Sequence, residues 1–215
     1  MKLLEVKKLN KSFDNKEILK DINFNVSSGK IIGLLGKNGA GKTTLIKLMN
    51  DLLTPSSGEI RIKGNKVGVE SKKIISYLPE RTYLNKQMKV SEVVAYFKDF
   101  YEDFDEEKAK RLLKDLDLDI NQRLTKMSKG MQEKVQLVLV MSREADLYIL
   151  DTILSNCNEK ASVIISTHLI SDIERILDEV IFIDKGKIIL QSDADKLRKK
   201  EKSSIDEIFR RMFKC

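Results

Sequence analysis

A glycine-rich stretch, GKNGAGKT at positions 36–43, constrains the fold of this chain more than any other feature. It fits the pattern G-x-x-x-x-G-K-[ST], which requires a β-strand before it and an α-helix after it. The apolar run Ile31–Leu35 precedes the stretch and predicts a buried strand. Apolar residues at helical spacing follow it, at Leu45, Leu48, Met49 and Leu52. The stretch therefore predicts an α/β fold in which one strand leads into a loop and a helix.

The chemistry of this loop indicates a bound triphosphate. Its three glycines let the backbone wrap closely, so that successive N–H groups point at one anion. The helix that begins near Lys42 adds the positive end of its dipole. We expect Lys42 to reach the β- and γ-phosphates and the Thr43 hydroxyl to ligate Mg²⁺. The predicted nucleotide contacts are Gly36, Lys37, Asn38, Gly39, Ala40, Gly41, Lys42, Thr43 and Thr44. Kinases, GTPases and transport ATPases share the pattern, so it does not choose a reaction.

The rest of the chain predicts an α/β core interrupted by a helical lobe. Residues 2–35 alternate in the β manner, with Ile22, Phe24 and Val26 on one face. Further strands are expected at 58–62, 163–166 and 180–183. Residues of about 90–143 are mainly helical in pattern, with Ser91 as N-cap, and the tail at about 203–214 predicts one amphipathic helix. We also predict a capping box at Ser171 and Glu174, and a buried aromatic stripe at Tyr96, Phe97, Phe100, Tyr101 and Phe104.

Composition sets only loose bounds on function. The chain has 215 residues, which suits a single domain at 1–215, and no apolar run approaches the roughly 20 residues that cross a bilayer. Its start, MKLLEVKKLN, does not resemble a signal peptide. Two cysteines, Cys157 and Cys215, lack metal-ligand spacing and indicate a reduced cytosol. The formal charge of +7 is dispersed apart from one basic cluster at 196–202, so charge alone decides nothing.

Beyond the glycine-rich loop, the order of short motifs resembles the nucleotide-binding subunit of ABC-type transporters over nearly the whole chain. MSKGMQ at 127–132 looks like the signature sequence of that family, with lysine and methionine at its third and fifth positions. In the family this element serves the ATP bound by the opposite subunit, which implies a head-to-tail dimer. The residues that match it are Ser128, Lys129, Gly130, Met131 and Gln132.

The same resemblance implies roles for four further residues. Glu80, in ISYLPE, occupies the place of the family's Q-loop glutamine, whose oxygen faces Mg²⁺ or the attacking water. Phe13 matches the aromatic that stacks on adenine, although a phenylalanine judged on sequence alone is more often a core residue. His168 follows a predicted strand and matches the switch histidine that contacts the γ-phosphate. Asp151 ends LYILD and should hold Mg²⁺ through water. The fold implied is a P-loop NTPase core with a mixed sheet, an N-terminal antiparallel β region and a helical lobe.

The sequence departs from the family directly after Asp151. There the family has a catalytic glutamate, a proline and an aspartate-containing D-loop, whereas this chain has Thr152 and no proline after Pro79. Asp151 and His168 are only 17 positions apart, which indicates that the acid, the D-loop and part of a helix are missing. Thr152 to Ser162 supplies 11 residues, enough for a parallel crossover of about 10–12. We therefore expect the sheet to form, the dimer face to be damaged, and hydrolysis to lose about 10²–10⁴ in rate.

These features favour an ATP-binding subunit of an ABC-type exporter, peripheral on the cytoplasmic face of the membrane. Its expected cofactors are ATP and Mg²⁺. Its expected partners are a separate membrane-spanning permease and a second nucleotide-binding subunit in a homo- or heterodimer, and no nucleic acid. Two alternatives remain open at this point: a degenerate regulatory subunit of a heterodimer, and a soluble ABC-type ATPase acting on nucleic acid or ribosomes. A small-molecule kinase would leave the signature stretch and His168 unexplained.

Overall fold

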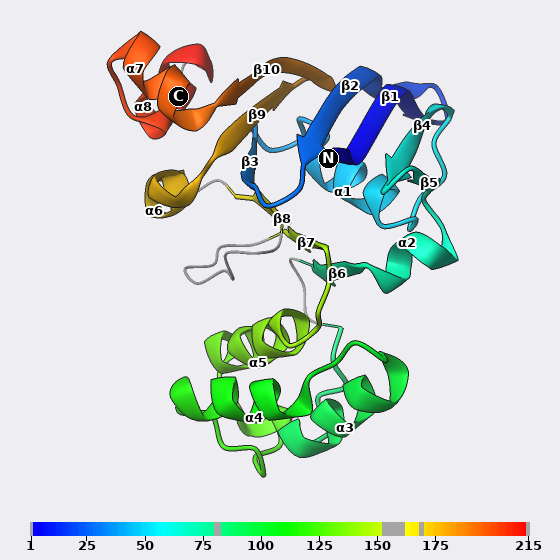
Figure 1. Cartoon of the computed structure of the whole chain (residues 1–215), viewed down its shortest axis with the longest axis vertical. Helices are drawn as coiled ribbons and strands as arrows, with labels where there is room; N and C mark the ends of the chain where they lie inside the picture. The colour runs from blue at the N-terminus through cyan, green and yellow to red at the C-terminus, as the bar shows by residue number, and fades with distance from the viewer. Residues whose placement is uncertain (1, 80–82, 152–161, 168–169, 214–215) are drawn as a thin grey trace. The chain divides into compact units, whose positions relative to one another are not determined.

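The computed structural model describes residues 2–79, 83–151, 162–167 and 170–213. The chain divides into two compact units. The first, here called the core unit, comprises Met1–Ile75 and Asp146–Cys215. The second, the helical unit, comprises Ser76–Ala145. Each unit is described by itself, and the elements are labelled in Figure 1.

The core unit begins with an antiparallel sheet in the strand order β2-β1-β4-β5 (Figure 1). Its long strands are β1 (Lys2–Phe13) and β2 (Lys16–Ser27), and β4 (Ser57–Ile62) and β5 (Asn65–Lys66) complete it. The side chains of Ile22, Phe24 and Val26 on β2 are all buried, as their alternation predicts. The expected N-terminal antiparallel region is thereby confirmed.

A second, mixed sheet carries the predicted site. Within the core unit its strands run in the order β10-β9-β3-β8-β7. Strand β3 (Ile31–Leu35) pairs in parallel with both β8 (Ser162–Ser166) and β9 (Glu179–Asp184). Strand β7 (Leu147–Leu150) runs parallel to β8, and β10 (Lys187–Asp193) runs antiparallel to β9. Strands β7 and β8 are buried along their whole length, which is why they read as continuous apolar runs.

The parallel pair β7–β8 forms across the shortened part of the sequence. Leu147 pairs with Ser162 and Leu150 pairs with Ile165, so the register is regular over the full strands. The prediction that the sheet survives the short crossover is confirmed. Residues 152–161, which include Thr152 and the position of the expected D-loop loss, lie outside the described residues.

Helix α1 (Lys42–Met49) follows the glycine-rich stretch and is shorter than its apolar spacing predicts. Leu52 lies beyond the helix and its side chain is 56% exposed, so its assignment to the buried face is wrong. Asn50 is the C-cap, and its backbone N–H and its side-chain amide both donate to the Ile46 carbonyl. Asp51 then takes a left-handed conformation with φ 54°, which no helix can continue.

The helical unit contains α3 (Val90–Phe100), α4 (Glu106–Asp115) and α5 (Lys129–Met141). The prediction that Ser91 is the N-cap of α3 is wrong. Lys89 is the N-cap and the helix begins at Val90, and the Glu92 carboxylate accepts the Lys89 backbone N–H at 2.7 Å. The acid three residues after the cap position satisfies this N–H, and a serine cap is not needed.

The aromatic stripe of α3 is only partly core. Phe97 and Phe104 are buried in the apolar cluster of the unit. Tyr96 and Phe100, in contrast, are 57% and 64% exposed and stack on each other with ring centroids 6.0 Å apart. The buried face of α3 is formed by its valines and Phe97. Tyr96 and Phe100 lie to one side of that face, and their rings therefore point outward.

The C-terminal part of the core unit contains α6 (Ile170–Ile173), α7 (Ala194–Glu201) and α8 (Ile205–Phe213). Helix α8 confirms the predicted amphipathic tail. The predicted capping box is wrong: Ser171 lies inside the short α6, and its hydroxyl donates to Asp172. The Glu174 carboxylate instead accepts the Asp206 backbone N–H at the start of α8, over 3.1 Å. The remaining described elements are α2 (Val69–Lys73), β6 (Ile75–Leu78) and two short 3-10 helices, η1 (Leu124–Lys126) and η2 (Glu174–Ile176).

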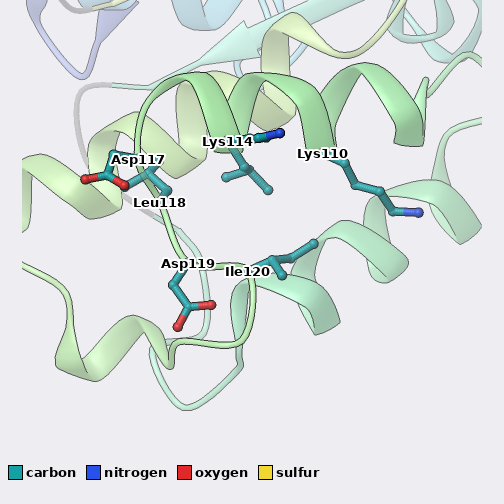
Figure 2. Close-up of a pocket in the computed structure, with 7 residues that line it drawn as sticks. Lys110, Lys114, Asp117, Leu118, Asp119 and Ile120 are labelled. Atoms are coloured by element: carbon teal, nitrogen blue, oxygen red, sulfur yellow. The ribbon is translucent and has the colours of Figure 1, made fainter.

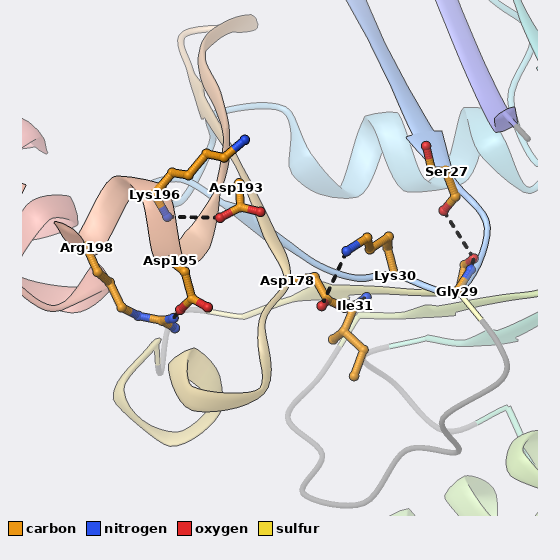
Figure 3. A network of polar contacts seen from close by, with 10 residues as sticks. Ser27, Gly29, Lys30, Ile31, Asp178, Asp193, Asp195, Lys196 and Arg198 are labelled. Carbon is orange, nitrogen blue, oxygen red and sulfur yellow. Dashed lines mark hydrogen bonds and ion pairs between the residues drawn. The ribbon is translucent and has the colours of Figure 1, made fainter. Parts of the chain in front are cut away.

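A polar network fixes the beginning of β3 (Figure 3). The Asp178 carboxylate accepts the Ile31 backbone N–H at 2.8 Å, and the Ile31 carbonyl accepts the Asp178 N–H at 2.9 Å. The Lys30 ammonium lies 3.7 Å from the same carboxylate. The Ser162 hydroxyl accepts the Gly29 N–H at 2.8 Å. Because the first residue of β3 is held in this way, the position at which the strand enters the loop is also set.

Candidate functional site

The glycine-rich loop follows β3, and at two of its positions a side chain would meet neighbouring atoms. A Cβ at Gly36 would lie 2.3 Å from the Ile183 carbonyl oxygen of β9. At Gly41, φ is 108°, and a Cβ would lie 2.7 Å from Leu19 of β2. Glycine is therefore required at Gly36 by packing against a backbone oxygen and at Gly41 by the left-handed backbone conformation.

Backbone hydrogen bonds shape the loop between these two glycines. The Ala40 N–H donates to the Lys37 carbonyl at 3.1 Å, and the Ala40 carbonyl accepts the Gly186 N–H at 3.0 Å. Gly186 belongs to the tight turn between β9 and β10, so the loop is tied to the mixed sheet. Helix α1 begins directly after Gly41, which provides no side-chain cap. The first turn of α1 is thus built like the helix starts that bind anions.

The Lys42 side chain folds back over this loop. Its ammonium donates to the Gly36 carbonyl at 2.6 Å and to the Lys37 carbonyl at 3.1 Å. The side chain is half-buried, whereas Lys37, Asn38 and Thr43 are exposed. The structure therefore brings residues 36–44 together in one cradle, with the Lys42 ammonium held at its edge and Thr43 exposed to solvent.

Asp151 lies at the same edge of the mixed sheet as this cradle. It follows β7 directly, and only 8% of its surface is exposed. Strands β3, β8 and β7 are parallel neighbours, so their carboxyl ends, followed by the loop, by Thr167 and by Asp151, share one edge. Ligands of parallel α/β sheets bind at this edge. Thr167, which is 3% exposed, was missed by the sequence analysis; its signal is a polar residue directly after the buried strand VIIS.

The donors present suit magnesium bound together with a triphosphate. Among the described residues no three His, Cys, Asp or Glu side chains form a metal-binding group. Mg²⁺ sites in nucleotide-binding proteins commonly use one or two protein ligands, with phosphates and water supplying the rest. The Thr43 hydroxyl and the Asp151 carboxylate fit that requirement.

Phe13 is a surface residue and not a core residue. It is the last residue of β1, and its side chain is 42% exposed. The Lys11 ammonium lies over its ring, 4.7 Å from the centroid. The alternative of a core phenylalanine is thereby excluded, and a flat apolar face remains available to a ligand.

The signature residues stand at the start of α5 in the helical unit. Ser128 is the N-cap, and its hydroxyl accepts the Met131 N–H at 3.2 Å. Lys129 and Gly130 are exposed, and Lys129 pairs with Glu133 at 3.6 Å. The Gln132 side chain turns inward and donates to the Leu124 and Met127 carbonyls, at 3.0 Å each. The Ser128–Gly130 end of the helix is thus open, while Gln132 braces the segment that leads into it.

Three of the predicted residues, Glu80, Thr152 and His168, lie outside the described residues, and their roles stay predictions.

A hollow of about 510 Å³ in the helical unit contains none of the predicted site residues (Figure 2). It lies between α4 and the segment after it and is lined by Lys110, Leu113, Lys114, Asp117, Leu118, Asp119 and Ile120.

Comparison with known proteins agrees with this geometry. Residues 19–155 match the family model described as ABC transporter. The chain is 30% identical over 211 residues to the SkfA peptide export ATP-binding protein SkfE of Bacillus subtilis, covering 88% of each protein. It is 27% identical over 236 residues to the ABC-type transporter ATP-binding protein EcsA of Bacillus subtilis, covering 97% of this chain and 96% of that protein.

Solved structures show the same architecture. An ATP-binding subunit of an ABC transporter superposes with a TM-score of 0.84 at 28% identity, covering 96% of this chain and 98% of the other. A nucleotide-free ATP-binding cassette from an ABC transporter superposes with a TM-score of 0.76 at 17% identity, which supports the fold alone; it covers 93% of this chain and 94% of the other. The expected P-loop NTPase fold is confirmed. The chain belongs to the ABC transporter family, in which it is an ATP-binding subunit.

Proposed function

We propose that this chain binds Mg-ATP in the cradle of residues 36–44, hydrolyses it slowly, and transmits the bound state to a separate membrane permease. The observation that carries the proposal is the pairing of an intact cradle with Asp151 at the same sheet edge. The backbone amides and the Lys42 ammonium neutralise the phosphates. Thr43 and Asp151 would hold a magnesium ion, which would offset negative charge on the phosphates.

Slow hydrolysis follows from the residue after Asp151. The family places a glutamate there to polarise the attacking water, whereas this chain has Thr152. A threonine hydroxyl cannot accept a proton at neutral pH, and loss of a general base lowers a rate by about 10²–10⁴. Binding does not depend on this residue, so binding and hydrolysis should separate. His168 and Glu80 would support the γ-phosphate and the water, respectively.

Coupling to a permease is supported by the family and by the surface of the helical unit. Tyr96 and Phe100 present stacked, exposed rings that suit an apolar partner. No helix in the described ranges is long and apolar enough to cross a membrane. On the basis of the family, we place the membrane-spanning part in a separate permease chain, with this subunit peripheral on the cytoplasmic face. One relative is named a peptide export protein, which favours export over import here.

The binding part of the proposal is tested by calorimetric titration of the full chain with ATP, with and without Mg²⁺. We expect saturable binding that Mg²⁺ strengthens. The variant Lys42→Ala should bind about 10- to 100-fold more weakly. Lys47→Ala, which changes an exposed lysine on the same helix, should bind as wild type does and is the matched control. Equal binding by wild type and Lys42→Ala would contradict the site.

A second candidate function is that of a regulatory partner in a heterodimer. The opening at Ser128–Gly130 favours it, because this chain can offer a signature helix to an intact partner while its own site is slow. Co-purification with an intact ATP-binding subunit, followed by Ser128→Arg in this chain, would test it. Loss of hydrolysis at the partner's site is expected; unchanged hydrolysis would exclude the role.

A further inference from the structure

We propose that Lys11 is a positioning residue for the nucleotide base, which it serves by holding the Phe13 ring as a fixed platform. The inference rests on the proposed binding of ATP. It assigns to Lys11 a role in distinguishing an adenine nucleotide from a bare triphosphate.

The contact between the two side chains is direct. The Lys11 ammonium lies 4.7 Å from the centre of the Phe13 ring, within the range of a cation–π interaction. The same ammonium donates a hydrogen bond to the Thr54 carbonyl at 2.8 Å. One N–H group therefore anchors the charge to the backbone, and the charge covers one face of the ring.

The backbone beneath this contact is fixed up to the residue before Phe13. The Ser12 N–H donates to the Ser56 hydroxyl at 3.0 Å, and the Ser56 N–H donates to the Asn10 carbonyl at 2.9 Å. Phe13 ends the strand, and Asp14 turns the chain with φ 48°. The ring stands at the end of a pinned strand with 42% of its side chain exposed, so contacts with the protein core hold it weakly. Lys11 restricts its motion.

The anchor also relates the ring to the phosphate cradle. Helix α1 begins at Lys42 in the cradle, and the chain that leaves its other end reaches Thr54 five residues after Met49. The carbonyl that holds Lys11 thus belongs to the short segment that leaves the helix whose N-terminus lies in the cradle. A base platform linked to the cradle through this segment suits a single nucleotide that spans both.

Two other roles for Lys11 make different predictions. If Lys11 only ties β1 to the loop at Thr54, its removal lowers stability and leaves nucleotide preference unchanged. If its ammonium contacts the phosphates, its removal weakens every triphosphate equally. Acting through the ring, it should affect only ligands that carry a base, and only while the ring is present.

The experiment compares the affinities of the full chain for Mg-ATP and for Mg-tripolyphosphate, which lacks base and sugar. Lys11→Met should weaken Mg-ATP about 2- to 5-fold, the size of an exposed cation–π contact, and leave tripolyphosphate unchanged. Phe13→Leu should weaken Mg-ATP about 10-fold. In the Phe13→Leu background, Lys11→Met should have no further effect. Lys11→Arg should retain wild-type affinity, and Lys7→Met, on the same strand and exposed, is the matched control.

Three results would overturn the inference: an equal loss of affinity for both ligands, a full Lys11→Met effect in the absence of the ring, or no effect on Mg-ATP. Thermal unfolding of each variant verifies that it is folded, and Lys11→Arg supplies a second comparison if Lys11→Met is unstable. If wild type binds neither ligand, the proposed function fails and this inference with it. If wild type binds both and Lys11→Met has no effect, only this inference fails.

Discussion

The Lys42 ammonium donates to the Gly36 carbonyl oxygen at 2.6 Å, so the second-last residue of the glycine-rich stretch reaches back to the first. A second bond, to the Lys37 carbonyl at 3.1 Å, fixes the charge at the edge of the cradle. The charge is thus held in place before any ligand arrives, which reduces the entropy lost on binding. Phosphate oxygens carry more negative charge than carbonyl oxygens, so exchange of these partners for a triphosphate is favourable.

The first prediction concerns the packing of Gly36 under β9. Gly36→Ala should destabilise the chain by about 1–3 kcal/mol, because its Cβ would meet the Ile183 carbonyl oxygen at 2.3 Å and the backbone must shift. Gly68→Ala is the matched control, since no atom lies within 4 Å of its Cβ position, and it should change stability by less than about 0.5 kcal/mol. Urea unfolding measures both values. A Gly36→Ala protein as stable as wild type would show that β9 does not pack closely against the loop at Gly36.

The second prediction concerns Thr152. Thr152→Glu should raise the ATPase rate by up to the factor of about 10²–10⁴ that a general base supplies. The affinity for Mg-ATP should stay within about 3-fold of the wild-type value. Thr152→Gln has nearly the same size but accepts no proton, so it should leave the rate unchanged. Steady-state phosphate release is the measurement. A fast wild-type enzyme, or equal rates for the two variants, would refute the assignment of slow hydrolysis to this residue.

The third prediction concerns the pH dependence of stability in the helical unit. The Lys98 and Lys110 ammonium groups, at 2.5 and 2.9 Å, lower the pKa of Glu106 from 4.5 to about 2. A carboxyl group whose pKa is lower in the folded state stabilises that state above pH 4.5, and this stabilisation disappears as the pH falls toward 2. Glu106→Gln should therefore lower the melting temperature at pH 6, and the difference from wild type should shrink steadily below pH 4.5.

Glu107→Gln is the comparison for that series, because Glu107 also pairs with Lys110 but is far more exposed. It should change the melting temperature less than Glu106→Gln does at pH 6. A difference between Glu106→Gln and wild type that stays constant from pH 6 to pH 2.5 would mean that the two ion pairs do not stabilise the unit.

The fourth prediction concerns Arg143, which follows α5. Its guanidinium is only 4% exposed, forms two hydrogen bonds to Asp103 at 2.9 and 3.1 Å, and lies 4.0 Å from the centre of the Tyr101 ring. Arg143→Met should cost about 2–4 kcal/mol, because it leaves the Asp103 carboxylate without its partner. Arg111→Met, on the exposed surface of α4, should cost less than about 0.5 kcal/mol. Equal values in urea unfolding would show that the pair contributes nothing.

The parts of the fold that could be predicted from sequence are those decided by local pattern. The buried strands β3, β7, β8 and β9 are continuous apolar runs, and the glycine-rich stretch fixes the loop and the start of α1. The turn Lys185-Gly186, with φ values of 44° and 77°, and the strand β10 after it were missed. Two consecutive residues with positive φ form a two-residue hairpin turn, so this dipeptide between apolar runs was a usable signal.

Other features depend on tertiary contacts that no local pattern contains. Helix α7 is mostly charged, and its best signal was Asp193, whose carboxylate caps the Lys196 N–H at 2.9 Å. Ser91 and Ser171 have the residue types of caps, but the helices begin elsewhere. Tyr96 and Phe100 are spaced as in a helix, but their spacing does not show which side of α3 faces the core. Residue type and spacing were enough to select Lys42 and Asp151 as candidates, and their roles stay predictions. The role proposed for Lys11 could be inferred only from the observed ring contact.

The most direct test of the central claim is calorimetric titration of the full chain with Mg-ATP, in parallel with its Lys42→Ala variant. We predict saturable binding to wild type and a loss of affinity of about 10- to 100-fold in the variant, the size expected for hydrogen bonds from a charged group. Wild-type protein that is folded but releases no heat with Mg-ATP, or a variant that binds as tightly as wild type, would contradict the claim that the cradle of residues 36–44 holds the nucleotide.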